Sequence, residues 1–186
     1  MRRALLGLGL ALLSGCADGL VTISLDVEDT TVVEGGGILS ELIGSLGFDG
    51  FAEMNLVASQ ELQNQGVEPG DIEEVRLTLI ELTAASPDDA DLSFLSEMQV
   101  SVQGPDLPEI PVAFQDSFPE GQRAVTLSLE DAELSAYVVS ESMTFTTDVT
   151  GSPPVDDTEV HALISLDVRV TAQGVVNQVR SDDQSE

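Results

Sequence analysis

The sequence VHALISLDVRVT, residues 160–171, alternates apolar and polar side chains more regularly than any other part of the chain. The apolar positions are Val160, Ala162, Ile164, Leu166, Val168 and Val170. Polar residues occupy most of the positions between them, including His161, Asp167 and Arg169. A period of two predicts a β-strand with one face in the core and the other in solvent.

The same alternation recurs at intervals along the chain. It predicts strands at residues 21–27, 50–62, 75–82, 98–102, 124–129 and 140–150. In the first strand, Glu28-Asp29-Thr30 is expected to end or fray the pattern. Residues 50–62 also fit a helix, and Asn55, Val57 and Ser59 favour the strand.

Irregular features interrupt these strands. A shift of phase near Ile80 indicates a bulge or a strand that is buried on both faces. The segment bracketed by Pro108 and Pro111 can form only an edge strand or an extended loop. After an acidic loop at residues 86–91, the apolar side chains of Leu92, Phe94 and Leu95 are expected to return to the core.

Little helix is expected. Apolar spacing predicts a short amphipathic helix at residues 38–46. Asp71 is a candidate N-cap for one helical turn through Glu74. Another single helical turn is expected within residues 130–137, with Tyr137 buried. Short strands separated by Gly, Pro and Asp turns predict a mainly β fold: a single antiparallel β-sandwich, immunoglobulin-like or jelly-roll-like, with one or two short helices. We expect this domain to span residues 21–173 and a disordered acidic tail to follow at 174–186.

The N-terminal sequence has the features of an export signal. Met1-Arg2-Arg3 precedes an apolar run that ends in Leu13-Ser14-Gly15-Cys16. This ending resembles the lipobox of bacterial lipoproteins, and the resemblance implies a signal peptide at residues 1–15, lipid on Cys16 and a lipidated tether at residues 16–20. Ala17, and not aspartate, follows the cysteine, which implies an outer-membrane location in the cell envelope. A generic signal peptide with a chance cysteine is the alternative.

Composition restricts the partners. The formal net charge is −28, and removal of Arg2 and Arg3 with a signal peptide makes it about −30. Such a surface repels phosphate backbones, so nucleic acid is not an expected partner. A basic envelope or matrix partner is expected instead, alongside the membrane that the Cys16 lipid would contact. Hydrophobic residues make up 42% of the chain, which favours a folded domain over disorder.

Two acidic loops are the candidate metal sites. Asp88, Asp89 and Asp91 lie in one loop and Asp156 and Asp157 in another, and clustered carboxylates suit Ca²⁺. The spacing is not that of an EF-hand, and solvated acidic turns are the alternative interpretation.

No catalytic motif accompanies the single histidine, His161, so an enzyme is not expected. The function expected first is a lipid-anchored envelope protein with a structural or binding role and no cofactor. A calcium-stabilised adhesion or matrix-binding module is the alternative, and a hydrolase is a distant one. At the level of class alone, the layout resembles uncharacterised surface lipoproteins.

Overall fold

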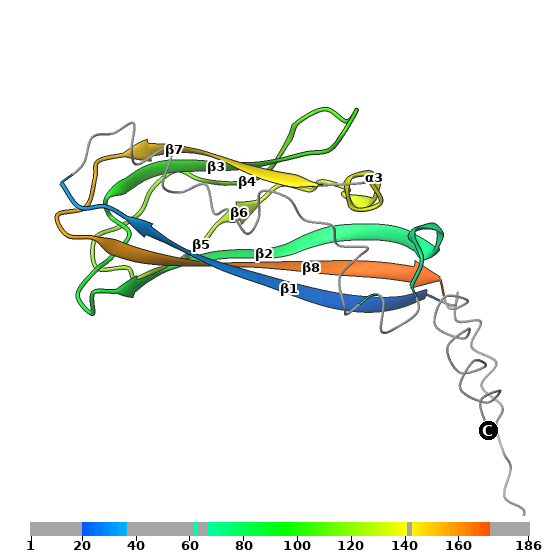
Figure 1. The fold of residues 1–186 in the computed structure, drawn as a ribbon, viewed down its shortest axis with the longest axis horizontal. Coiled ribbons are helices and arrows are strands. Elements are labelled where there is room, and N and C mark those ends of the chain that lie inside the picture. Colours follow the sequence, from blue (N-terminus) through cyan, green and yellow to red (C-terminus); the bar gives the residue numbers. More distant parts are fainter. Residues whose placement is uncertain (1–19, 37–61, 63–66, 141–142, 172–186) are drawn as a thin grey trace, which may run out of the picture.

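The fold is described from a computed structural model, which defines residues 20–36, 62, 67–140 and 143–171. Figure 1 shows two layers of strands that run along the long axis of the molecule. Each layer is a four-stranded antiparallel sheet, with strand orders β1-β8-β2-β5 and β6-β4-β3-β7. The prediction of a mainly β antiparallel sandwich is therefore confirmed.

Three long strands and one short strand form the first sheet: β1 (Leu20–Val33), β8 (Thr158–Thr171), β2 (Ile72–Ser86) and β5 (Ala124–Thr126). The strand predicted from residues 160–171 lies at the centre of this sheet, where β8 pairs with β1 on one side and β2 on the other. Its six alternating apolar residues are all at most 2% exposed. The alternation therefore identified the main core-facing strand correctly.

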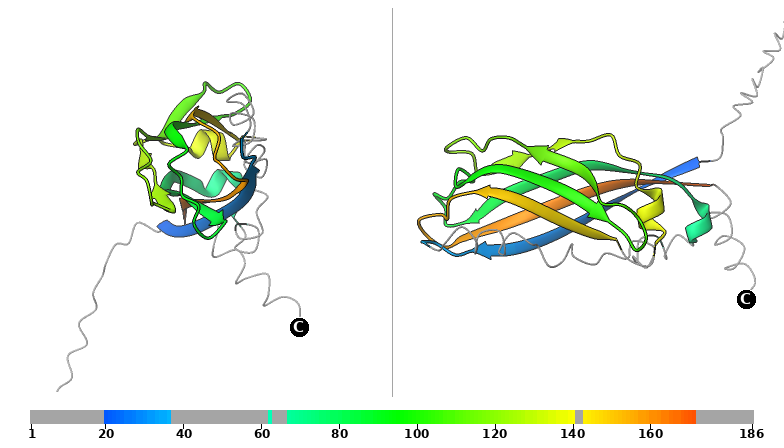
Figure 2. Two further views of the ribbon diagram at one scale, coloured as in Figure 1. Left: turned by 90° about the vertical axis from the view of Figure 1, so that its left-hand side faces the viewer. Right: turned by 90° about the horizontal axis from the view of Figure 1, so that it is seen from above.

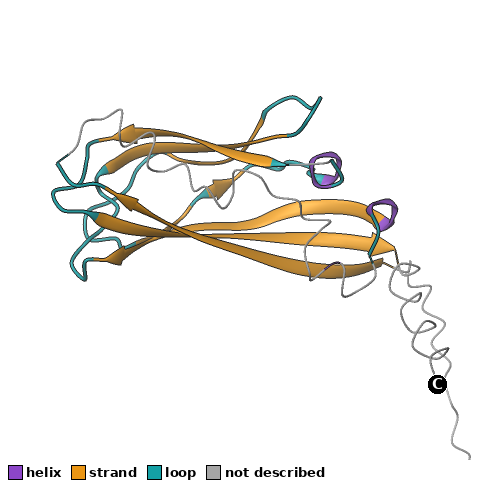
Figure 3. Ribbon diagram, viewed as in Figure 1, coloured by secondary structure: helices purple, strands orange, loops and turns teal. Residues whose placement is uncertain are grey.

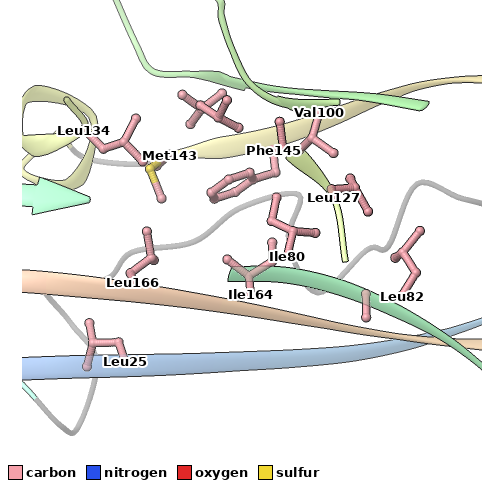
Figure 4. Close-up of a cluster of buried hydrophobic side chains, with 14 of the residues drawn as sticks. Leu25, Ile80, Leu82, Val100, Leu127, Leu134, Met143, Phe145, Ile164 and Leu166 are labelled. Carbon is pink, nitrogen blue, oxygen red and sulfur yellow. The ribbon is translucent and has the colours of Figure 1, made fainter. Parts of the chain in front are cut away.

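The second sheet contains β6 (Ser128–Leu129), β4 (Ile110–Gln115), β3 (Leu95–Gln103) and β7 (Thr144–Gly151). The two sheets face each other when the molecule is seen end-on (Figure 2). Aliphatic side chains from both sheets fill the space between them, and Phe145 is the only aromatic residue among those labelled in Figure 4. The core residues labelled there are Leu25, Ile80, Leu82, Val100, Leu127, Leu134, Met143, Phe145, Ile164 and Leu166. Burial of apolar surface between the sheets is the main stabilising contribution to such a fold.

Two short helical elements lie at the end of the sandwich where β1 begins and β8 ends (Figure 3). They are the 3₁₀ turn η3 (Pro69–Asp71) and the single α-helical turn α3 (Ser135–Val138). Tyr137 is buried, as predicted, and its hydroxyl donates a hydrogen bond of 2.8 Å to the carbonyl oxygen of Pro108. The predicted helix at residues 38–46, nearly all of the predicted strand at 50–62 and the predicted tail at 174–186 lie outside the described residues.

Several predicted boundaries are wrong. β1 does not end at Glu28-Asp29-Thr30, because pairing with β8 continues as far as Val33 opposite Thr158. Asp71 does not begin a helical turn: the N-cap is Glu68, and Asp71 is the last residue of η3, where its carboxylate accepts a hydrogen bond from the Glu68 backbone at 3.0 Å. The predicted strand at 124–129 is two strands, because the chain passes from the first sheet to the second at Leu127.

Of the two irregularities predicted from the sequence, the structure contains the one in β2 and contradicts the one at Pro111. A bulge in β2 falls between Leu77 and Leu79, close to the predicted change of phase at Ile80. β4 is an interior strand and not an edge strand, because β6 pairs with it, but only at Ala113 and Phe114. Pro111 lies outside that short pairing and next to a register shift opposite β3, where its missing N–H is tolerated.

Candidate functional site

The two predicted acidic loops meet at the end of the sandwich opposite to the start of β1 (Figure 1). They line an open cleft of about 400 Å³, which we call the distal cleft. Asp89 and Asp91 contribute carboxylates from the loop after β2, and Asp156 contributes one from the loop before β8. The rest of the lining mixes apolar residues, among them Phe94 and the almost fully exposed Val155, with the hydroxyl residues Ser93, Ser152 and Thr158.

Asp91 holds the first loop in place. One carboxylate oxygen accepts hydrogen bonds from the Ser93 hydroxyl at 2.6 Å and the Ser93 backbone N–H at 2.9 Å. The other oxygen accepts a bond of 2.6 Å from the backbone N–H of Gly121, which has a φ of +77°. The Ser93 hydroxyl, together with the two backbone donors, holds the pKa of Asp91 below its usual value of 3.8. The ionised carboxylate of Asp91 is therefore a structural element of the loop.

Arg123 holds the same loop from the side of β5. Its Nη2 donates to the carbonyl oxygens of Ala84 at 2.9 Å and Ala85 at 3.2 Å, and its Nη1 donates to the carbonyl oxygen of Asp88. The planar guanidinium can satisfy several acceptors at once, which a lysine cannot do in one geometry. Asp88 is thus fixed through its backbone, and its side chain does not line the distal cleft.

The second loop is tied to the end of β1. The Asp157 carboxylate accepts a hydrogen bond of 2.9 Å from the backbone N–H of Gly35, and the Pro154 carbonyl accepts one of 2.9 Å from Gly36. A Cβ atom on Gly35 would lie 2.6 Å from the carbonyl carbon of Asp156, so this close approach requires glycine. Asp157 therefore anchors β1 and does not line the cleft.

The five predicted calcium candidates consequently divide into two groups. Asp89, Asp91 and Asp156 line one cleft, whereas Asp88 and Asp157 do not. Among the described residues, no group of three or more His, Cys, Asp or Glu side chains is arranged so that it could hold a metal ion. Calcium binding remains a prediction, and Cys16, the predicted lipid attachment site, lies outside the described residues.

Sequence reasoning missed an ionic network on the outer face of the first sheet. Glu74 lies 2.5 Å from Arg76 and 2.5 Å from Arg169, and Arg76 lies 2.5 Å from Asp131. The hydrogen bond from Arg76, followed by that from Arg169, lowers the pKa of the Glu74 carboxyl, and the same contact with Glu74 raises the pKa of Arg76. Arg169 and Glu74 are opposite each other in the β2–β8 register. The sequence alone does not show that these two strands are neighbours, so it could not predict this ion pair.

The single histidine is close to an acidic neighbour. His161 Nε2 lies 3.7 Å from a carboxylate oxygen of Glu28 on β1, and its side chain is 35% exposed. This position agrees with the prediction that His161 lies on the polar face of the last strand. Within the described ranges, no helix is long and apolar enough to cross a membrane.

No protein family matches this sequence, and no curated protein matches it significantly.

Proposed function

We propose that this protein is a lipid-anchored component of the bacterial cell envelope that acts by binding and not by catalysis. The observation that supports it is the position of the first strand relative to the predicted attachment site. β1 begins at Leu20, four residues after Cys16, and an extended chain of this length reaches at most about 14 Å. A lipid on Cys16 would hold this end of the sandwich against the membrane.

The opposite end would then be displayed away from the membrane. β8 has 14 residues, which corresponds to a length of roughly 45 Å. The loops that line the distal cleft lie at the far end of these strands (Figure 1), so the carboxylates of the cleft would face the surroundings and not the lipid headgroups. This orientation avoids the repulsion between the acidic cleft and anionic lipids.

Lipid labelling and membrane fractionation test the anchor. In bacteria that express the full chain and are fed labelled palmitate, we expect the protein to carry the label and to sediment with membranes. Cys16→Ser should abolish both, while Ala17→Ser, which keeps the thiol, should leave both intact. Label on the Cys16→Ser protein would refute the anchor. Ala17→Asp tests the outer-membrane assignment separately, since it should retain the label but change the membrane fraction in bacteria that use that sorting rule.

A calcium-stabilised adhesion or matrix-binding module is the second candidate, supported by the presence of Asp89, Asp91 and Asp156 in the lining of one cleft. Hard cations prefer several oxygen ligands, so bound Ca²⁺ would stabilise this end of the fold. We expect the melting temperature of the full chain to be higher in millimolar CaCl₂ than in matched MgCl₂, and the difference to disappear in Asp89→Asn/Asp156→Asn. Equal melting temperatures in the two salts would eliminate this candidate.

A further inference from the structure

Among the described residues, positive charge lies on one side of the sandwich. Arg76, Arg169 and His161 lie on β2 and β8, and Arg123 immediately precedes β5, so all four belong to the first sheet or border it. The sequence has no basic residue between Arg76 and Arg123 or between Arg123 and His161. Every strand of the second sheet falls in these two intervals. The second sheet therefore has no cation of its own.

A groove crosses the outer face of this second sheet. Phe114 on β4 pairs with Gln99 on β3, and Gln99 pairs with Asp148 on β7, so the three side chains form one row across the sheet. Glu97, Asp116 and Thr150 complete the outward-facing lining of a groove of about 400 Å³, which we call the Phe114 groove. Adjacent strands lie about 4.8 Å apart, which places Phe114 and Asp148 roughly 10 Å from each other on either side of Gln99.

The groove combines an accessible aromatic ring with carboxylates that lack cations. Phe114 is 37% exposed, whereas its inward-facing neighbours Val112 and Ala113 are fully buried. In the part of the chain that the structure describes, Glu97, Asp116 and Asp148 form no ion pair. The outer face of the first sheet differs, because Glu74 there is bridged by two arginines. Among the described residues, no cation balances the negative charge of the Phe114 groove.

The charge of the molecule restricts the occupant. Nucleic acid, anionic lipid and a second copy of this chain would each bring further negative charge to the groove. A guanidinium suits it, because it stacks on an aromatic face and at the same time donates hydrogen bonds to a carboxylate. An arginine side chain is also long enough to lie over Gln99 between the ring and Asp148. We propose that the Phe114 groove docks an arginine-bearing basic segment of a partner protein.

This proposal rests on the binding role proposed above and not on the lipid anchor. Peptide binding is measured on purified protein in solution, so its failure can be distinguished from a failure of the lipid-labelling test. The probe is a fluorescein-labelled peptide of four Arg-Ser repeats, with Lys-Ser and Glu-Ser peptides of the same length for comparison. Binding to the purified full chain is followed by fluorescence anisotropy at 50 and 300 mM NaCl. We expect the Arg-Ser peptide to bind most tightly, the Glu-Ser peptide not to bind, and binding to weaken at the higher salt concentration.

Variants separate the groove from the general negative field. Phe114→Ala and Phe114→Leu should each raise the Kd about two- to fivefold, a range typical of an exposed cation–π contact. Phe114→Tyr keeps an aromatic ring and should leave the Kd close to that of the wild type. Asp148→Asn should weaken binding, whereas Glu159→Gln, which removes an equal charge from an exposed position on β8, should change the Kd less than twofold. Equal losses in Asp148→Asn and Glu159→Gln, or an unchanged Kd in folded Phe114→Ala, would overturn the proposal.

Discussion

The Asp91 carboxylate provides a sharp test of how the distal end is built. It accepts three hydrogen bonds, two from Ser93 and one from the backbone of Gly121. In Asp91→Asn, an NH₂ group replaces one of the two carboxylate oxygens, and it cannot accept the hydrogen bonds that this oxygen accepts. Hydrogen bonds to charged groups contribute about 1.5–3 kcal/mol, and the exposure of this site favours the lower part of that range. We expect the free energy of unfolding to fall by about 1–2 kcal/mol.

The assay is urea and thermal unfolding at pH 7 in the presence of EDTA, so that any bound Ca²⁺ makes no contribution. For a chain of this length, the expected loss corresponds to a fall in melting temperature of about 2–8 °C. Asp89→Asn is the matched control, because it removes the same charge from the same loop and Asp89 accepts no hydrogen bond from the described residues. We expect the control to change the free energy of unfolding by less than about 0.5 kcal/mol.

The pH dependence provides a second measurement on the same two proteins. The pKa of Asp91 is lowered in the folded state, so its ionised form stabilises the fold fully above its usual value of 3.8. That contribution is lost as the pH falls below 3.8 and through the lower folded-state pKa. The stability difference between the wild type and Asp91→Asn should therefore shrink at low pH. Equal effects of Asp91→Asn and Asp89→Asn, or a difference that does not depend on pH, would refute the structural role of Asp91.

Two further substitutions test the packing. Leu166→Ala at the centre of β8 removes a fully buried side chain and should lower the free energy of unfolding in urea by about 2–5 kcal/mol. Leu163 is only partly buried on the same strand, so Leu163→Ala should lower this free energy clearly less. Gly151→Ala would place a Cβ 3.0 Å from the Cα of Leu95 and closer still to a backbone carbonyl oxygen, so the melting temperature of this variant should fall. Gly70→Ala is the control: its Cβ would have no atom within 4 Å, and the protein should melt within about 2 °C of the wild type. A Leu163→Ala loss as large as that of Leu166→Ala, or a Gly151→Ala protein as stable as Gly70→Ala, would contradict this packing.

The sequence predicted strands best where side-chain alternation and strand pairing agree. Residues 160–171 alternate without interruption, and every apolar residue at the predicted core positions is buried. β1 shows the opposite case, because polar residues from Glu28 to Thr30 suggested an end to the strand. Pairing with β8 carries β1 on to Val33, which is 1% exposed, so contacts with a neighbouring strand outweighed local composition.

The candidate site could be predicted only in part, because its geometry comes from contacts between distant segments. The acidic loops were identified from composition, but the positions of their carboxylates depend on Gly35, which donates to Asp157, and on Ser93 and Gly121, which donate to Asp91. None of these donors has a sequence signal that links it to its acceptor. The change of sheet at Leu127 is similarly invisible, since one apolar alternation spans residues that pair with β2 and residues that pair with β4.

The three arginines among the described residues act as bridges within the fold. Arg76 joins Glu74 to Asp131, Arg169 joins β8 to Glu74, and Arg123 gathers three carbonyl oxygens at the distal end. Arginine suits this use because its planar fork holds several acceptors in a fixed geometry, and the chain contains no lysine. These contacts leave the carboxylates of the second sheet without an intramolecular cation in the described residues. Salt ions or a basic partner can neutralise these carboxylates, so partner binding should depend on ionic strength more steeply than the stability of the fold does.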